Sequence, residues 1–535
     1  MSQQASRRAF LRHAAALGSL GAAAPLGMSL SMLGHASAQA AQGDYKALVC
    51  VFLAGGNDAY NTVVPTDSDS WTHYVNQRDP MARGSAGSGT SIALLPAGTA
   101  ANTQAEAGSP ARLGGVLPIG HSGRAAHASR QFAMHPLLTD VQGLHQAGRV
   151  AVLANVGPLK RRLTKAEYLG EVAPRPAKLF SHNDQQSTWQ SFSPEGADNG
   201  WGGRMGDLLM SGNATGLGAA AGLAQRSFTC LSPGSNGIWL SGAQVQALQV
   251  GAMGLLDLGG WGSVLGSSSL RSAMAEVMST GTADNLFWAD HQAVAQRSMA
   301  IQSLIGPILP PLSSTNGSAP WATPGNANPW IDPMLSYLSP NTGAARFNSL
   351  ALQFQMVARL IDANRTGNLG MRRQVFMVTL GGFDTHAIQN QEHSERMAQL
   401  NHALAYFDRV LGQMPSGDMR NQVTTFTASE FGRNLANNGD GTDHGWGSHH
   451  LIMGGAVNGR EVYGTYPQLA TGNTNNQYDS PDLLQNGAML PSTSVDQYAY
   501  TLGKWMGLSA GDLSGILPNL GNFNSSTHDL GFMAT

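Results

Sequence analysis

Carboxylate and imidazole side chains of this chain gather in short, glycine-rich motifs far apart in the sequence. The motifs are Gly55-Gly56-Asn57-Asp58, Gly382-Phe383-Asp384-Thr385-His386, Ser429-Glu430-Phe431-Gly432-Arg433 and Asp443-His444-Gly445. Carboxylate oxygens and imidazole nitrogens bind divalent metals, and the same groups act as general acids and bases. The sequence therefore predicts a metal centre or an acid/base site assembled from distant segments.

Asp384 and His386 form the strongest of these pairs. They are two residues apart, so in an extended or turn segment both side chains can converge on one ion. The alternative is that Asp384 caps the helix that follows it. We favour metal ligation because His386 can point the same way.

Glu430 and Arg433 follow the next apolar run. Glu430 could ligate a metal, and Arg433 could bind an oxyanion. The alternative is a simple ion pair between the two side chains. Asp58, after the Gly55-Gly56 turn, could likewise ligate a metal or accept hydrogen bonds from turn N–H groups.

The segment that begins at Asp443 also holds His444, His449 and His450. Its glycines keep the backbone pliable, so imidazoles can turn inward. We expect Asp443 and His444 to take part in the metal site, and His449 or His450 to be structural.

Ser181 and His182 are adjacent. A serine hydroxyl is inert at neutral pH unless a base or a metal activates it. Ser181 is therefore a candidate nucleophile only together with the metal, and His182 could be a ligand or a supporting group. An ordinary Ser-His pair in a loop is the alternative.

The elements that must position these motifs are predicted from apolar runs and helical spacing. Runs typical of strands cover residues 45–54, 149–155, 375–380, 423–428 and 450–454. Helical spacing is found over residues 136–147, 345–363, 391–414 and 495–506. Alternating strands and helices predict an α/β domain with a parallel sheet, and such sheets place ligands at the carboxyl ends of their strands.

Composition bounds the class of protein. The chain has 535 residues, a net charge of −2, 42% hydrophobic residues and only 12% charged residues, against about 25% in ordinary domains. A near-neutral charge gives no electrostatic case for nucleic acid. We expect a single domain over residues 39–535, with an insertion at about residues 207–340.

The N-terminus predicts export. Ser6-Arg7-Arg8-Ala9-Phe10-Leu11 is a twin-arginine pattern, an apolar stretch follows, and Ala36-Ser37-Ala38 is an Ala-x-Ala cleavage site. Residues 1–38 are therefore expected to be a signal peptide read by the twin-arginine translocase, which predicts a periplasmic or secreted protein. A membrane anchor is the disfavoured alternative, and no later stretch is apolar enough to span a bilayer.

Cys50 and Cys230 are the two cysteines. A periplasmic location would permit a disulfide between them. Cys50 lies inside an apolar run, however, so we favour buried free thiols.

Together, the twin-arginine signal and the motifs resemble the bacterial domain-of-unknown-function family 1501 (DUF1501). The motifs that carry the resemblance are Gly55-Gly56-Asn57-Asp58-Ala59-Tyr60-Asn61-Thr62, Ser181-His182, Gly381-Gly382-Phe383-Asp384-Thr385-His386, Ser429-Glu430-Phe431-Gly432-Arg433 and Thr442-Asp443-His444-Gly445. That family is similar to the alkaline phosphatase superfamily, which includes sulfatases and cofactor-independent phosphoglycerate mutases.

The resemblance implies a three-layer α/β/α sandwich with inserted loops and a cap. It implies that Asp58 is the ligand after the first strand, that Asp384 and His386 bind one metal, and that Glu430 and His444 complete one or two sites. It also makes Ser181 the candidate nucleophile, with Thr62 as a rival. The ion or ions would be Zn²⁺, Mn²⁺, Fe²⁺, Mg²⁺ or Ca²⁺.

The leading functional hypothesis is a periplasmic, metal-dependent hydrolase of phosphate or sulfate esters on a small molecule or a polymer. Arg433 would clamp the oxyanion. A formylglycine sulfatase is disfavoured because neither Cys50 nor Cys230 is followed by x-Pro-x-Arg. The alternatives are a non-catalytic secreted binding or assembly protein on the same fold, and a protein with a purely structural metal.

Overall fold

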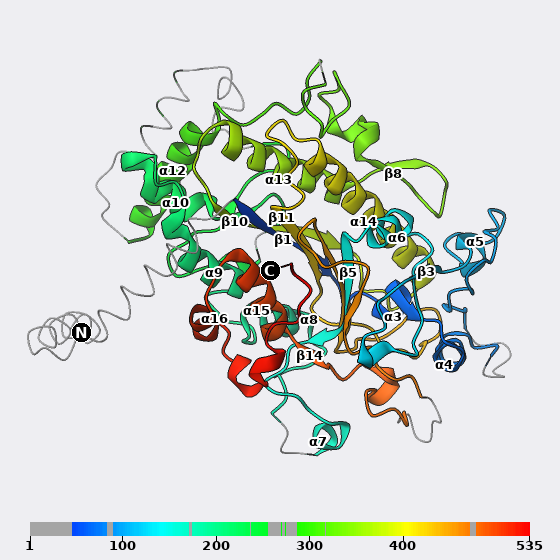
Figure 1. The fold of residues 1–535 in the computed structure, drawn as a ribbon. Helices are drawn as coiled ribbons and strands as arrows, with labels where there is room; N and C mark the ends of the chain where they lie inside the picture. Colours follow the sequence, from blue (N-terminus) through cyan, green and yellow to red (C-terminus); the bar gives the residue numbers. More distant parts are fainter. Residues whose placement is uncertain are drawn as a thin grey trace, which may run out of the picture.

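A computed structural model describes residues 45–82, 89–170, 174–235, 237–254, 286–315, 317–470 and 478–534, together with the single residues 269, 273 and 276. Figure 1 shows a central sheet with helices around it. The expected signal peptide, residues 1–38, lies outside the described residues.

The central sheet is mixed but mostly parallel. Its strand order is β13-β5-β12-β11-β1-β10-β6-β7, and β14 also pairs with β5. The strands are β1 (Lys46–Ala54), β5 (Val150–Gly157), β6 (Cys230–Ser232), β7 (Leu248–Gln249), β10 (Arg373–Gly381), β11 (Val423–Ala428), β12 (Ser448–Met453), β13 (Val462–Gly464) and β14 (Thr493–Ser494). An α/β fold is therefore confirmed.

One strand departs from the expected parallel arrangement. β12 runs antiparallel to both of its neighbours, β11 and β5. The chain leaves β11 and returns as β12 through the loop 429–447, without a crossover helix, and a direct return of this kind gives an antiparallel pair. That loop carries Glu430, Arg433, Asp443 and His444.

β1 lies at the centre of the sheet between β10 and β11, and both pairings are parallel. Its side chains alternate between two cores: Val49 and Val51 belong to one, and Cys50 and Phe52 belong to the other. The continuous apolar run of β1 therefore reflects burial on both faces of the sheet.

Helices cover both faces. One face packs against α6 (Thr139–Gln146), α13 (Ser349–Thr366) and α14 (Gln389–Gly412), which bring Val141, Phe354 and Met397 to the first core. The opposite face packs against α8 (His182–Ser191), α9 (Trp201–Leu209) and α15 (Val495–Met506), which bring Trp189, Met205 and Tyr498 to the second. In Figure 1, α13 and α14 lie above the sheet and α15 lies below it.

The prediction of a helix over residues 345–363 is wrong at its start. Ala345–Phe347 forms β9, which pairs with β8 (Ser336–Leu338). Asn348 then caps α13 by accepting hydrogen bonds from the Leu350 and Ala351 N–H groups. The cap satisfies N–H groups that the first turn leaves free, so the helix begins after it.

The remaining elements flank the sheet. β2 (Val63–Pro65), β4 (Phe132–Met134) and β3 (Leu117–Ile119) form a small separate sheet. The other helices are α3 (Ala59–Thr62), α4 (Ser68–Arg78), α5 (Pro110–Leu113), α7 (Lys165–Leu169), α10 (Ala221–Phe228), α12 (Leu286–Ile305) and α16 (Ala510–Ile516). β6 and β7, inside the expected insertion, extend the central sheet.

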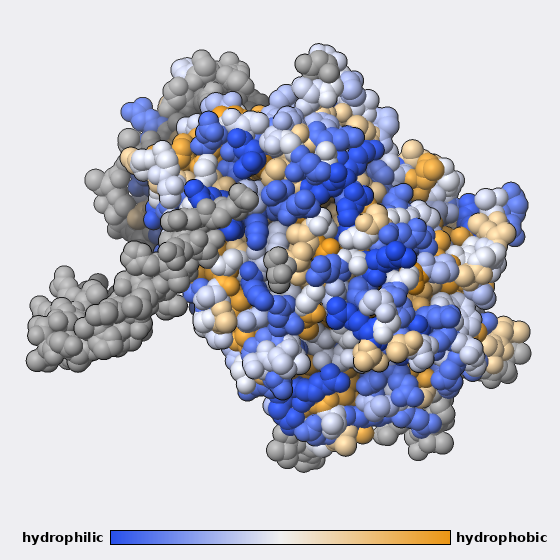
Figure 2. Space-filling model, in the orientation of Figure 1, coloured by the Kyte–Doolittle hydropathy of each residue, from blue (hydrophilic) through white to orange (hydrophobic). Residues whose placement is uncertain are grey.

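Cys50 and Cys230 are both buried and free, as expected. Figure 2 shows hydrophilic residues over most of one face, with hydrophobic residues in scattered patches. Within the described ranges, the structure contains no helix that is both long and apolar enough to cross a membrane.

Candidate metal centre

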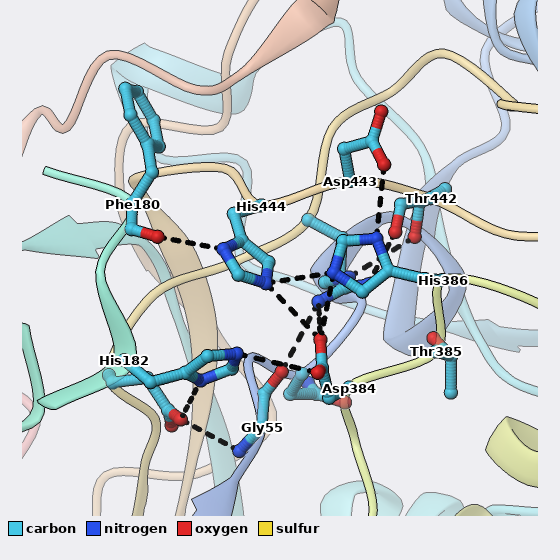
Figure 3. Close-up of polar contacts among 12 residues, drawn as sticks. Gly55, Phe180, His182, Asp384, Thr385, His386, Thr442, Asp443 and His444 are labelled. Carbon is cyan, nitrogen blue, oxygen red and sulfur yellow. Dashed lines mark hydrogen bonds and ion pairs between the residues drawn. The ribbon is translucent and has the colours of Figure 1, made fainter.

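Three imidazoles surround one carboxylate at the carboxyl edge of β10 and β11 (Figure 3). The Nε2 atoms of His386 and His444 lie 3.1 and 3.2 Å from Asp384 Oδ1. His182 Nε2 lies 3.4 Å from the other oxygen, Oδ2. The structure therefore brings together four groups from segments that are up to 262 residues apart in the sequence, from His182 to His444.

The other ring nitrogen of each imidazole is held by an acceptor. Nδ1 of His182 lies 3.0 Å from Glu430 Oε1, and Nδ1 of His386 lies 3.0 Å from Asp443 Oδ1. Nδ1 of His444 lies 2.8 Å from the carbonyl oxygen of Phe180. Since these partners accept hydrogen bonds, each Nδ1 donates its proton, and each Nε2 faces Asp384, where in the neutral tautomer its lone pair is available to a metal ion.

A tight turn after β10 places Asp384 and His386. Gly382 adopts φ +91°, and the Phe383 N–H donates to the Ala54 carbonyl at 3.1 Å. The His386 N–H donates to the Asp384 carbonyl, which closes the turn. Asp384 does not cap α14, whose N-cap residue is Ile388. The capping alternative is therefore excluded, and both side chains of the pair face the same point.

Gly55 forms the floor of the site. Its N–H donates to Glu430 Oε1 at 2.8 Å, and its carbonyl accepts from Arg433 Nη1 at 3.3 Å. A Cβ atom at Gly55 would lie 2.4 Å from the Asp384 backbone nitrogen, and its φ is +118°. Only glycine permits this approach of the first strand's end to Asp384.

His444 is fixed by the loop between β11 and β12. An isolated antiparallel bridge joins Arg433 to His444, and the Gly445 N–H donates to the Gly432 carbonyl at 2.7 Å. The buried ring of Phe431 packs against the imidazoles of His182 and His444, with centroid separations of 4.9 and 4.5 Å. The loop therefore brings His444 back to the carboxyl edge of β11, where Glu430 also lies.

The segment before α8 is strained. Lys178 and Phe180 adopt φ values of +50° and +73°, a region that side chains larger than glycine rarely occupy. This backbone directs the Phe180 carbonyl at His444 and sets His182 at the first position of α8. Strain of this kind persists where the surrounding structure imposes it, and it often accompanies a functional site.

Burial and neighbouring groups shift the pKa values of Asp384, His182 and His444. Partial burial raises the pKa of Asp384, but the hydrogen bond and charge of Arg433 outweigh it and lower that pKa below its ordinary value. The hydrogen bond to Glu430 raises the pKa of His182. Burial lowers the pKa of His444, against the opposing effect of the Phe180 carbonyl. Asp384 is thus held as the carboxylate.

The structure gives the predicted residues different positions around the cluster. Glu430 and Asp443 hold His182 and His386 from outside. Arg433 has a fully buried side chain, donates to Asp384 Oδ1 at 2.8 Å, and pairs with that carboxylate rather than with Glu430. Arg433 therefore positions Asp384. This role differs from the oxyanion clamp that the sequence predicted.

Asp58 is not brought to the cluster. Its buried carboxylate forms an ion pair with Arg78, accepts from Gln389 Nε2 at 2.6 Å, and accepts from the N–H groups of Tyr60 and Asn61. These four donors occupy the carboxylate. Asp58 therefore matches the second interpretation of the sequence, in which it accepts hydrogen bonds from turn N–H groups. We leave Asp58 out of the metal centre.

The hydroxyl groups of the nucleophile candidates donate hydrogen bonds to groups other than Asp384. Ser181 Oγ donates to Asp184 Oδ2 at 2.9 Å. Thr62 Oγ1 donates to the Asp58 carbonyl at 2.7 Å and is buried. His449 and His450, expected to be structural in part, are both buried in β12, where desolvation lowers the pKa of each imidazole to about 3.

Sequence reasoning missed the Phe180 carbonyl and the Gly55 backbone as parts of the site. Both act through main-chain atoms, which every residue carries. The residue type of Phe180 gave no signal, and the glycine at position 55 signalled only a turn after the strand. The positive φ of Phe180 is also invisible in the sequence, because phenylalanine has no preference for that region.

The donor set fits a divalent metal ion. His182, Asp384 and His444 each offer one ligand atom, and these atoms lie within 4.8 Å of one another. His386 Nε2 lies beside this group of three, 2.9 Å from His444 Nε2. Imidazole nitrogens with one carboxylate suit Zn²⁺, Mn²⁺ or Fe²⁺ better than Mg²⁺ or Ca²⁺, which prefer oxygen ligands.

Comparison with known proteins gives one match. The model of the family described as "Protein of unknown function (DUF1501)" matches residues 343–517, a segment that contains Asp384, His386, Glu430 and His444. Neither a curated protein nor a solved structure matches the chain. The match over residues 343–517 supports the DUF1501 family, as the motifs predicted.

Proposed function

We propose that this chain is an exported, metal-dependent hydrolase of phosphate or sulfate esters. The observation that carries the proposal is the convergence of three Nε2 atoms, from His182, His386 and His444, on Asp384 while each Nδ1 donates outward. Metal-binding histidines are typically oriented in this way by an acceptor on the second nitrogen.

Each protein group then has a defined task. Asp384 and the imidazoles would hold one ion, with Glu430 and Asp443 fixing the rings. Arg433 keeps Asp384 ionised and oriented through its hydrogen bond at 2.8 Å. When bound, a divalent ion would polarise the ester and offset the negative charge that develops on the transferred group.

Access to the cluster supports catalysis over a purely structural metal. The side chains of Asp384 and His386 are 44% and 45% exposed, whereas the supporting Glu430 side chain is 3% exposed. A structural metal site is normally closed by its protein ligands, while a catalytic site keeps one side open. The open side leaves room for an ester group, including one carried by a polymer.

The proposal includes an alkaline phosphatase-like α/β/α sandwich. Helices on both faces of the sheet and a cluster at the carboxyl edge of β10 and β11 support it. The twin-arginine pattern at Arg7 and Arg8 supports export to the periplasm or beyond.

A specific observation favours the non-catalytic alternative. Ser181 Oγ donates to Asp184, and Arg433 is committed to Asp384. Neither residue is therefore placed in the role that the hydrolase hypothesis first gave it. A metal-bearing binding or assembly protein would retain the cluster without needing a nucleophile or an oxyanion clamp.

The deciding experiment combines metal analysis with turnover. Mature protein exported through its own signal is analysed by plasma mass spectrometry, beside Asp384→Asn and the exposed control Asp69→Asn. We expect about one equivalent of metal in the wild type and the control, and loss in Asp384→Asn. Nitrophenyl phosphate and nitrophenyl sulfate then test hydrolysis.

Turnover that disappears with the metal supports the hydrolase. Bound metal without turnover of either ester class would favour the binding or assembly protein. A folded wild-type protein that takes up no divalent ion would overturn both the metal centre and the hydrolase.

A further inference from the structure

A second candidate site is a cavity of about 250 Å³ at the C-terminal end of α8. Residues that line it and enter the argument are Leu159, Lys160, Thr188, Phe192, Asp496 and Asn519. The cavity lies between the end of α8 and the first turn of α15. The metal centre, in contrast, includes His182 at the beginning of α8, so the two sites occupy different ends of the helix.

Asp496 is the buried charge of this cavity. Asp496 is 0% exposed, and its carboxylate accepts hydrogen bonds from the Asn519 N–H at 2.9 Å and from Asn519 Nδ2 at 3.3 Å. Desolvation raises the pKa of Asp496 to about 7. Within the part of the chain that the structure describes, Asp496 forms no ion pair. A buried carboxylate without a cationic partner is costly, and a bound cation would relieve that cost.

Lys160 is the opposite charge. It lines the same cavity and is exposed, and among the described residues it forms no ion pair either. A ligand with only a positive charge would meet the Lys160 ammonium, and one with only a negative charge would meet the Asp496 carboxylate. A ligand that carries both charges avoids both repulsions.

We propose that this cavity binds a free α-amino acid, with the ligand ammonium at Asp496 and the ligand carboxylate at Lys160. Thr188 Oγ1, which donates to the Asp184 carbonyl, retains lone pairs that can accept from the ammonium. The side chains of Leu159 and Phe192 supply an apolar wall for a short aliphatic side chain.

The size of the cavity agrees with this ligand class. Cavities for drug-sized ligands hold roughly 300–1,000 Å³, so a cavity of about 250 Å³ suits a smaller molecule. The inference does not depend on the proposed hydrolase, because none of its residues belongs to the metal centre.

Isothermal titration calorimetry on the mature protein tests the proposal with matched probes. L-Valine carries both charges, isobutylamine lacks the carboxylate, and isovalerate lacks the ammonium. We expect L-valine to bind with a dissociation constant on the order of 1 mM, and each single-charge analogue to bind at least about tenfold more weakly. Undetectable L-valine binding, or equal binding of isobutylamine, would overturn the proposal.

Two variants locate the ligand. Asp496→Asn should abolish L-valine binding, and Lys160→Gln should weaken it about tenfold, to the level of isobutylamine. Lys504→Gln is the matched control, because Lys504 lies on α15 and pairs with Asp529 outside the cavity. Since Lys160 is exposed, its variant is expected to fold, and unchanged binding there would contradict the assignment even if Asp496→Asn failed to fold.

Discussion

The Nε2 atoms of His386 and His444 lie 2.9 Å apart, although both rings already donate from Nδ1. In two neutral rings of this tautomer, both Nε2 atoms would carry lone pairs that face each other. Such a contact is stable only when a positive charge lies between the lone pairs, either a shared proton or a metal ion. Asp384 Oδ1, 3.1 and 3.2 Å from the two nitrogens, strengthens the attraction for that cation.

Glu430→Gln is expected to weaken metal binding without removing a ligand. The change removes the negative charge that fixes His182 Nδ1, and loss of such an outer partner typically costs about 10- to 100-fold in metal affinity. Competition with a chromogenic chelator measures the change. Glu392→Gln, on an exposed carboxylate that pairs with Arg396, is the control. An affinity equal to the control's would show that Glu430 does not support the site.

Ser181→Ala tests whether Ser181 is the nucleophile or only a hydrogen-bond donor to Asp184. Because Ser181 Oγ donates to Asp184, we expect the variant to keep its metal and to lose less than about tenfold in kcat. Ser187→Ala, on the same helix and with its hydroxyl on the Pro194 carbonyl, provides the comparison. A loss of about 1,000-fold or more with the metal retained would make Ser181 the nucleophile.

Asp58→Asn is expected to destabilise the fold and to leave the metal content unchanged. It leaves the fully buried Arg78 guanidinium without its counter-charge, a loss worth roughly 3–5 kcal/mol in the free energy of unfolding. Asp67→Asn breaks a partly exposed pair with Arg130 and should cost about 1 kcal/mol or less. Denaturant unfolding compares the two. Loss of metal in a folded Asp58→Asn protein would restore Asp58 as a ligand.

Asp496 predicts a pH dependence of stability. Its pKa is about 7 in the folded protein and 3.8 without burial, so between these values the folded chain holds a proton that the unfolded chain releases. The stabilising contribution of Asp496 is therefore complete below about pH 4 and is lost as the pH rises through about 7.

The measurement compares wild type with Asp496→Asn by denaturant unfolding at about pH 5 and about pH 8. Relative to the variant, the wild type should lose on the order of 3 kcal/mol between these conditions. Because asparagine has nearly the same shape as aspartate, its side-chain oxygen can still accept the hydrogen bond from the Asn519 N–H. A stability difference that does not change with pH would contradict a raised pKa.

Secondary structure was predictable where one local pattern decided it. The strand over Val423–Ala428 and the helix over Val495–Met506 have the predicted bounds. The strand is a short run rich in β-branched residues and buried throughout, and the helix has capping Ser494 before it and Gly507 after it. The direction of β12 was not predictable, because it depends on where the loop 429–447 returns.

The sequence by itself determined the α/β class, indicated the family and placed the candidate site at strand ends, because apolar runs and glycine turns are local signals. Only the tertiary structure decided which carboxylates meet the imidazoles. Asp58 and Asp384 both follow a glycine turn after a buried strand, but Arg78 engages the first while three imidazoles surround the second. An ionised carboxylate takes its role from the charges within a few ångströms, and those distances arise only when the chain is folded.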